Sequence, residues 1–595
     1  MSDKRLLYRN IAIWEMNRLT DETLNCEIGT GTMSSEEDSV ENLSFSAKCN
    51  GNNGNNEQFR KQMEIQRLRN QAQALQKDIK EKLTDELNTL FEQFITDVEQ
   101  YERLEEQNQN YVFKRSISTS RKKNGELPDK VFLPRRSVLT ELFEISHIKT
   151  IYHMFVAILI VFCLNTFVYD IVHEGRINLN FEMMQWALGK KSKVMELWVM
   201  MQLSTLVIVY PMFYYWANNR PAGPAKWIDY VVLSFYIAFM LAFLVLPVNY
   251  IMENALPPAS TVIIACEQLR LIMKMHSFVR ENIPRVLNFN NKKDDDSPTD
   301  EVMCPDFSKY LYFLFVPTLI YRDDYPRTKT IRWNYVVTNF GQVIGCLFFI
   351  YYIFMRFCVP YFHNFNQEHV TPELLVMTVF GCMLPGTLVL FIGFFAILHS
   401  WFNAFAEMLR FADRMFYKDW WNSTSFSNYY RTWNVVVHDW LYTYVYKDVC
   451  RVIGRGNKPA AMACVFVFYC YPLFSQVIGR GNKPAAMACV FVFSAIFHEY
   501  VLVLCFNFFY PVLLVMFAGA GFGFMFLTDK GVSRSWNVFL WVALFTGTGL
   551  LMCLYSMEWY ARINCPVNTD NIFDKLIPRS WTCNFEAMEN NLKSP

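Results

Sequence analysis

Two ionisable residues lie side by side in an apolar run near the end of the chain. His498 and Glu499 interrupt residues 492–505, which are otherwise aromatic, aliphatic or small. An ionisable side chain at membrane depth is costly in hydrocarbon, so it normally faces a protein interior or a wet cavity. A histidine there either acts as a general base near neutral pH or is a structural residue bonded to a helix carbonyl. On a helix Glu499 would project about 100° away from His498, so it is not automatically the group that orients the imidazole.

A second group of polar and aromatic residues lies upstream, at residues 416–422, with the sequence Phe-Tyr-Lys-Asp-Trp-Trp-Asn. A stretch rich in Ser and Tyr follows it as far as Arg431. Taken alone, such a motif is typical of the aromatic belt at a membrane–water interface. A functional interpretation therefore needs evidence from the rest of the chain.

The composition indicates a polytopic membrane protein. Of the 595 residues, 52% are hydrophobic and 17% are aromatic, and they gather in long runs. The net charge of +1 argues against a nucleic-acid partner. The 16 cysteines show no Cys-x-x-Cys pair and no His-Glu-x-x-His motif occurs, so no metal site is expected. The polar N-terminus shows no cleaved signal peptide.

Changes in polarity divide the chain into five regions. Residues 1–56 are polar and are expected to be disordered. Over residues 57–104, apolar residues recur every three or four positions, which predicts a long amphipathic helix. A solitary surface helix is one interpretation, but an apolar stripe of this length favours self-association. Residues 105–136 read as a basic linker on the cytoplasmic side, residues 137–564 as the membrane domain and residues 565–595 as a lumenal tail.

Long apolar segments predict an all-α membrane domain of about nine transmembrane helices behind a cytoplasmic N-terminal region. The candidate spans are residues 151–172, 194–216, 229–247, 335–358, 373–398, 487–510, 511–527 and 537–555, with a weaker candidate at 256–275 that charged residues interrupt. Residues 276–334 are expected to form a polar excursion from the membrane. Residues 400–450 are aromatic but charged, which predicts interfacial or re-entrant helices.

A segment of 17 residues occurs twice, letter for letter, at residues 452–468 and 477–493, an offset of 25 residues. Structural repeats normally come in several diverged copies, so we interpret this pair as a recent partial duplication or a mis-joined gene model. If the duplication is real, residues 460–475 add an apolar stretch slightly too short for a span. Were that stretch to cross the membrane, every later segment would change sides.

Residues 416–431 and the sequence His-Glu-Tyr-Val from His498 together resemble the sterol O-acyltransferases of the membrane-bound O-acyltransferase superfamily. The resemblance covers roughly residues 130–585. Asp419 is closer to the sterol enzymes, because the related diacylglycerol enzymes usually carry Glu there. Asn422 and His498 are 76 residues apart, and removing the 25-residue offset leaves 51, the spacing that the resemblance implies. The repeat is the one large departure from the family pattern.

The resemblance implies catalytic roles for three residues. His498 would remove the proton of a sterol hydroxyl as the oxygen attacks a thioester carbonyl. Asn422 would supply a polar group to the developing oxyanion, and Trp420 would wall the site. The residues implied in support are His438, Asp419 and Glu499. The remaining histidines, including His276 and His399, are expected to be structural.

Coenzyme A brings phosphates, so basic and amide groups are expected near the cytoplasmic mouth of the site. The resemblance implies acyl-CoA contacts at Asn428, Arg431, Tyr446, Lys483 and Ser494. The repeat leaves open whether Lys458 or Lys483 takes the basic position.

The resemblance also implies a disulfide between Cys565 and Cys583, which flank a short polar stretch near the C-terminus. A lumenal tail after nine passes would preserve such a bond, whereas eight passes would place the pair in a reducing compartment.

The expected activity is transfer of a long-chain fatty acyl group from acyl-CoA to the 3-hydroxyl of a sterol such as cholesterol. We expect a multi-pass protein of the endoplasmic reticulum membrane, a homo-dimer or homo-tetramer, with no cofactor beyond its co-substrate. Acyl transfer to diacylglycerol is the nearest alternative. From other classes, the alternatives are a transporter or sterol-binding protein that uses the buried His and Glu, and a catalytically inactive scaffold.

Overall fold

The structure, a computed structural model, describes most of the chain. The described residues are 63–93, 95–96, 129–176, 181–221, 223, 225–292, 304–363, 371–449, 483–528, 533–565 and 572–582. They belong to two units, Met1–Lys114 and Arg115–Pro595. Residues 1–56, the first copy of the repeated segment and Cys583 lie outside the described residues.

In the first unit, a helix covers residues 63–93 and 95–96, within the predicted amphipathic segment. Its apolar stripe is uncovered in a single copy, because Leu68, Leu75 and Leu83 are 61%, 61% and 65% exposed. Surface ion pairs between residues four apart lie on its polar side and each contributes little to stability. Self-association through the stripe remains a prediction.

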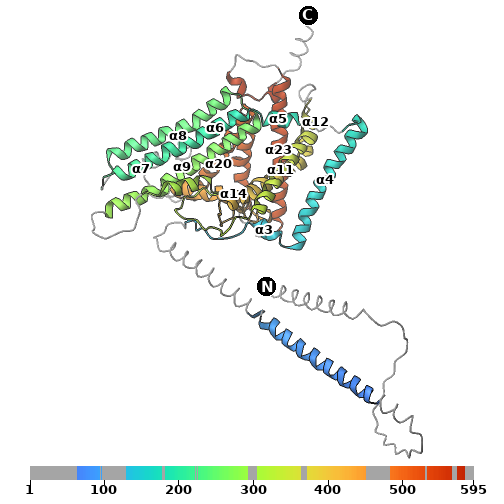
Figure 1. Ribbon diagram of the computed structural model, residues 1–595. Helices are drawn as coiled ribbons and strands as arrows, with labels where there is room; N and C mark the ends of the chain where they lie inside the picture. The colour runs from blue at the N-terminus through green and yellow to red at the C-terminus, as the bar shows by residue number, and fades with distance from the viewer. Residues whose placement is uncertain are drawn as a thin grey trace, which may run out of the picture. The chain divides into compact units, whose positions relative to one another are not determined.

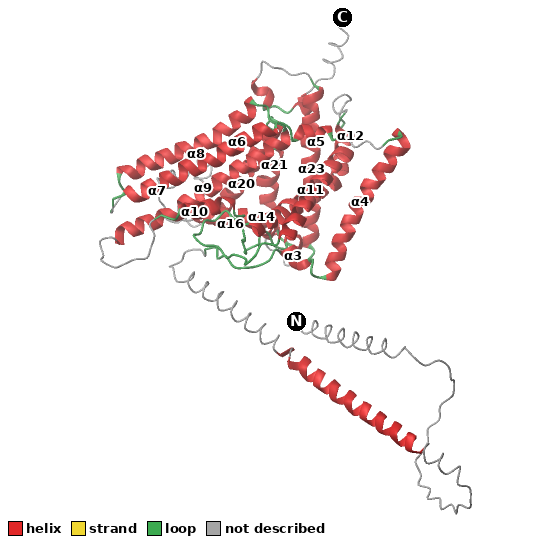
Figure 2. Cartoon of the chain, viewed as in Figure 1, coloured by secondary structure: helices red, strands yellow, loops and turns green. Residues whose placement is uncertain are grey.

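The second unit is a bundle of helices (Figures 1 and 2). Seven of its described helical segments are long and apolar enough to cross a membrane: Ser146–His173, Glu182–Asn219, Trp227–Glu253, Trp333–Phe362, Pro372–Met408, Met487–Phe506 and Trp536–Asn564. A shorter apolar helix covers Val512–Thr528. The predicted all-α, multi-pass architecture is confirmed, whereas nine passes and a cytoplasmic N-terminus remain predictions.

The long helices of the bundle are α4 (Ser146–Glu174), α6 (Lys191–Ser204), α7 (Tyr210–Asn219), α8 (Trp227–Glu253), α9 (Pro258–Lys292), α11 (Trp333–Ile353), α13 (Pro372–Phe394), α20 (Lys483–Phe506) and α23 (Trp536–Asn564). Helix α4 lies at the edge of the bundle (Figure 1). Wide π-helical turns extend or interrupt several of them, a feature frequent at functional sites. These turns are η1 (Thr205–Val209), η2 (Phe354–Cys358), η3 (Phe395–Trp401), η5 (Leu441–Tyr446) and η6 (Val515–Gly521).

Short helices connect the long ones, and several of them lie within residues 402–446, where short interfacial or re-entrant helices were predicted. They are α3 (Val138–Leu142), α5 (Glu182–Ala187), α10 (Phe307–Phe315), α12 (Val359–Phe362), α14 (Phe402–Met408), η4 (Trp420–Asn422), α15 (Phe426–Trp433), α16 (Val435–Trp440), α21 (Val512–Leu514), α22 (Phe522–Thr528), η7 (Ile572–Lys575) and α24 (Arg579–Thr582). Two isolated bridges, Arg135 with Asp413 and Arg327 with Phe411, are the only β pairing among the described residues.

Helix α9 continues unbroken to Lys292, so the first part of the predicted polar excursion, from residue 276, is helical, and its place outside the membrane remains a prediction. Phe278 and Val286 are fully buried on one side of this second half. Arg280, on another side, pairs with Asp448 at 3.1 Å. The charged residues therefore mark the polar face of an amphipathic helix, which a count of charges cannot distinguish from a solvated loop.

Helices α13 and α23 pack closely through glycine, as membrane helices often do. A Cβ atom at Gly386 would lie 2.8 Å from the Thr548 carbonyl oxygen. A Cβ atom at Gly549 would lie 2.7 Å from a side-chain carbon of Met383. Both helices therefore need glycine at the point where they meet.

We expect Gly386→Ala to destabilise the protein by about 1–3 kcal/mol, because its Cβ would push against the backbone of α23. Gly381→Ala is the matched control on the same helix, where a Cβ would meet no atom within 4 Å. It should be neutral or slightly stabilising. Thermal unfolding in detergent, followed by size-exclusion chromatography, measures both variants. Equal midpoints for the two variants would contradict the close approach.

Candidate active site

His498 lies in α20 and its side chain is exposed on the helix surface. Its Nδ1 is 2.7 Å from the carbonyl oxygen of Ser494, one turn earlier, and its ring stacks on Phe517 of η6 with centroids 5.3 Å apart. A carbonyl oxygen can only accept, so Nδ1 carries the hydrogen in this bond. The neutral imidazole then keeps Nε2 free as an acceptor, which is the form that a general base requires.

Glu499 points away from His498 and is only 4% exposed. Its carboxylate accepts hydrogen bonds from the backbone N–H of Leu514, at 3.1 Å, and from the hydroxyl of Tyr555, at 3.1 and 3.2 Å. These bonds tie α20 to α21 and α23. The Glu499 carboxylate therefore holds α20 against other helices, and its supporting role in the reaction remains a prediction.

The next residue, Tyr500, ties another side of α20 to α9. Its hydroxyl donates to the side-chain oxygen of Gln268 at 2.7 Å. The amide nitrogen of Gln268 donates in turn to the carbonyl of Phe243 at 2.8 Å. That carbonyl lacks its usual helical partner because Pro247, four residues later, has no N–H. Gln268 thus both donates to the unpaired carbonyl of α8 and accepts the hydrogen bond that holds α20.

A series of aromatic contacts connects His498 to the upstream motif. Phe517, which stacks on His498, also contacts Tyr430 of α15 with centroids 5.2 Å apart. In the same short helix, Trp433 packs against Trp420 of η4 at 4.7 Å. The tertiary structure therefore connects His498 to the 416–422 motif through η6 and α15.

The three motif residues named by the sequence differ in their surroundings. Trp420 is 3% exposed, within the aromatic cluster, and its buried Nε1 has no hydrogen-bond partner in the described part of the chain. Asp419 and Asn422 are exposed, and the Asn422 backbone N–H donates to the Asp419 carbonyl at 3.0 Å. Asn422 and His498 are both described by the structure, and no hydrogen bond connects them. Trp420 is thus part of the aromatic core, and the roles of Trp420 and Asn422 in the site remain predictions.

Asn537, at the start of α23, is a positioning residue that the sequence analysis missed. Its side-chain nitrogen donates to the carbonyls of Trp421 and Ser423 at 2.9 and 2.8 Å. These two bonds fix the turn that carries Asn422. The only signal in the sequence is a lone amide at the beginning of an apolar helix.

The predicted acyl-CoA residues lie on three different elements. Asn428 and Arg431 are exposed and three positions apart on α15, and Asn428 donates to the Ser423 hydroxyl at 2.9 Å. Ser494 lies one turn before His498, whereas Tyr446 stacks on Tyr442 in η5 with centroids 5.6 Å apart. Lys483 begins α20, and Lys458 lies outside the described residues.

His438, the second predicted supporting histidine, lies beside Asp439 in α16, with its Nδ1 3.6 Å from the carboxylate. The other carboxylate oxygen is 2.5 Å from the Lys130 ammonium. Burial raises the pKa of Asp439, but His438 and Lys130 together outweigh it and hold the pKa below its usual range. The ion pair is therefore intact at neutral pH and is lost as pH falls through this lowered pKa. Within the described residues, no group of three His, Cys, Asp or Glu side chains could hold a metal ion.

Cys565, at the end of α23, is disulfide-bonded. Its predicted partner, Cys583, lies outside the described residues. Cys553, which lies in the same helix, is a buried free thiol.

We expect Cys583 to be the partner of Cys565. A peptide map under non-reducing conditions should contain one cross-linked peptide with both residues, and Cys583→Ser should leave Cys565 open to alkylation. Cys553 should stay a free thiol in both proteins and serves as the control. Recovery of Cys565 joined to a different cysteine would contradict the pairing.

We expect Glu499→Ala to lower stability by about 1–3 kcal/mol, because the Leu514 N–H and the Tyr555 hydroxyl would lose a buried acceptor. Glu499→Gln keeps an acceptor oxygen and should retain most of the stability. Thermal unfolding in detergent compares the two. An unchanged midpoint for the alanine variant would show that the carboxylate does not hold α20 in place.

Comparison with known proteins shows extensive similarity. The model of the membrane-bound O-acyltransferase family, MBOAT, matches residues 181–471, a range that contains Asn422 but ends before His498. Sterol O-acyltransferase 1 of Mus musculus is 48% identical over 481 residues, covering 79% of this chain and 84% of that protein. Sterol O-acyltransferase 1 of Cricetulus griseus is 49% identical over 463 residues, covering 77% and 79%. Sterol O-acyltransferase 2 of Homo sapiens is 43% identical over 456 residues, covering 76% and 80%.

Proposed function

The chain belongs to the sterol O-acyltransferases of the membrane-bound O-acyltransferase family, and on this premise we propose that it transfers a long-chain fatty acyl group from acyl-CoA to the 3-hydroxyl of a sterol such as cholesterol. The family predicted from the sequence is thereby confirmed. The observation that carries the mechanism is the bond from His498 Nδ1 to the Ser494 carbonyl, which leaves Nε2 able to accept a proton.

The reaction needs a base, an oxyanion donor and a place for the donor substrate. Nε2 of His498 takes the sterol hydroxyl proton while the oxygen attacks the thioester carbonyl. The C–S bond then breaks, the coenzyme A thiolate leaves, and the imidazolium returns the proton to the sulfur. Since a thioester is already activated, these steps call for no cofactor beyond the co-substrate.

Polar residues around this base would bind the other parts of the donor. Asn422 is proposed to donate to the oxyanion, with Trp420 as the wall of the site. The residues proposed to contact coenzyme A are Asn428, Arg431, Tyr446, Lys483 and Ser494. The protein is proposed to act in the endoplasmic reticulum membrane as a homo-dimer or homo-tetramer.

Three other functions are outcomes that the same assay can reveal. Transfer to diacylglycerol would use the same base and the same donor. A sterol-binding or transport protein, and a catalytically inactive scaffold, would give no ester product.

We expect purified protein in mixed micelles to form sterol ester from oleoyl-CoA in preference to acylated diacylglycerol when both acceptors are present. His498→Ala should lose at least a hundredfold in turnover, the lower range of a general-base contribution of about 10²–10⁴-fold. Size-exclusion chromatography checks that the variant is folded. Full activity in a folded His498→Ala protein would refute the assignment of the base.

The same assay tests the other proposed parts one at a time. Asn422→Ala should reduce kcat more than KM, and an unchanged kcat would show that another donor meets the oxyanion.

Deletion of residues 452–476 removes one unit of the repeat. If only the shortened protein is active, the duplication disables the enzyme. If neither protein shows acyl transfer, the catalytically inactive scaffold is favoured.

A further inference from the structure

Residues 129–137, here called the strap, follow the N-terminal region in the sequence and lie against the chain leading into the 416–422 motif. The Arg135 backbone N–H donates to the Ala412 carbonyl, and the Arg135 carbonyl accepts from Arg414, both at 3.0 Å. The Arg135 guanidinium also donates to both carboxylate oxygens of Asp413, at 2.7 and 3.0 Å. The strap is thus docked by backbone and side chain together.

Apolar packing and a buried hydroxyl complete this docking. The ring of Phe132 packs edge-on against Tyr325, with centroids 5.1 Å apart, and contacts Phe411 at 6.2 Å. At the end of the strap, the Ser137 hydroxyl is 2.7 Å from the hydroxyl of Tyr417, a residue of the motif. The strap therefore has a fixed position from which it can hold other parts of the site.

The first two residues of the strap hold residues 435–449, here called the η5 segment. Lys130 pairs with Asp439 at 2.5 Å, and Asp129 pairs with Lys447 at 2.6 Å. Asp129 and Lys130, which carry opposite charges, thus pair with Lys447 and Asp439, which also carry opposite charges and lie about two helical turns apart. A shift of the segment by one turn would break both pairs, so the charges fix its register.

Helix α9 holds the other side of the η5 segment. Arg280 pairs with Asp448 at 3.1 Å, and the Tyr444 hydroxyl donates to Glu281 at 2.9 Å. Tyr446 lies between these contacts and next to Lys447. Its position therefore depends on ion pairs on both sides of the segment.

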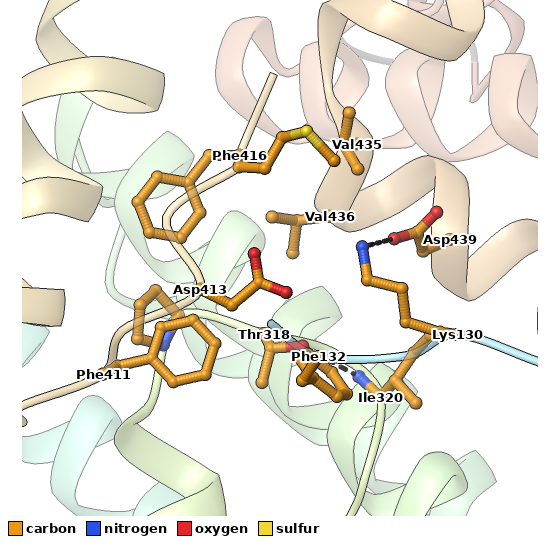
Figure 3. A pocket seen from close by; sticks show the side chains of 12 residues that line it. Lys130, Phe132, Thr318, Ile320, Phe411, Asp413, Phe416, Val435, Val436 and Asp439 are labelled. Atoms are coloured by element: carbon orange, nitrogen blue, oxygen red, sulfur yellow. Dashed lines mark hydrogen bonds and ion pairs between the residues drawn. The ribbon is translucent and has the colours of Figure 1, made fainter. Parts of the chain in front are cut away.

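The contact between the strap and the η5 segment combines apolar packing with ion pairs and is incompletely filled (Figure 3). A cavity of about 20 Å³, enough for one water molecule, separates them. Its lining includes Lys130, Asp413 and Asp439, and Figure 3 shows Lys130 reaching across to Asp439. Apolar packing of Phe132 against the cluster that contains Trp440 and Tyr444 holds the two segments together, and the ion pairs fix their register.

We propose that Asp129 and Lys130 are positioning residues for the acyl donor, which set the place of the η5 segment and thereby of Tyr446. This inference rests on the proposed function, because that function assigns Tyr446 to acyl-CoA.

Charge exchange tests the proposal. We expect Lys130→Asp and Asp439→Lys each to raise KM for acyl-CoA about fivefold or more, with kcat within about twofold, because each leaves like charges facing each other. The double variant should return KM to within about twofold of the wild type. Lys130→Met, which removes the charge without reversing it, replaces any single variant that fails to fold.

Arg136 and Glu144 provide the matched control. Arg136 of the strap and Glu144 of the following segment form an ion pair with side chains 62% and 64% exposed, and the η5 segment takes no part in it. Reversing both charges of this pair should leave KM for acyl-CoA unchanged.

Hydrogen exchange of residues 435–449, measured by mass spectrometry without substrate, separates this proposal from the proposed function. Exchange should accelerate in the single variants and slow again in the double variant. No acyl transfer by the wild type would overturn the proposed function, while the exchange data would still decide whether the strap holds the segment. Unchanged KM in active single variants, loss of kcat instead of KM, or no recovery in the double variant would each overturn the positioning role.

Discussion

The carboxylate of Glu499 lies buried in an apolar helix, where an acceptor without donors would be costly. Tyr555 of α23 and the backbone of Leu514 supply those donors, so α20, α21 and α23 must meet at this point. Tyr500 makes a comparable demand on α9 through Gln268. With two sides of α20 held, the rotation of the helix is fixed, and His498 on a third side is directed toward Phe517 of η6.

Satisfaction of buried polar groups also organises the rest of the membrane unit. Glu407, 1% exposed at the end of α14, accepts from Arg332 at 2.9 Å and from Arg414 at 2.6 Å. The Lys274 ammonium donates to the carbonyls of Phe313 and Val316 at the end of α10, where the helix leaves its last carbonyls unpaired. Such bonds help to hold the short helices α10 and α14 in place.

The same constraint explains which predictions the structure refined. His498 was expected either to serve as a base or to bond a helix carbonyl. The structure shows the bond from Nδ1 to the Ser494 carbonyl, which leaves Nε2 able to serve as a base. Residues beyond 276 were expected to form a polar excursion, and the structure shows that they continue α9 to Lys292, with Arg280 paired to Asp448 of a neighbouring element. Polar residues along a chain are ambiguous until their partners are known.

The sequence by itself determined the membrane character, most of the spans and the family, because long apolar runs and ordered motifs are local properties of the chain. Only the tertiary structure decided which polar groups meet. Lys130 and Asp439 are separated by 309 residues, and Asn537 reaches back 116 residues to the carbonyl of Trp421. No local pattern encodes such pairs, since each depends on how the helices pack and rotate against one another. That packing directs His498 and places Tyr446.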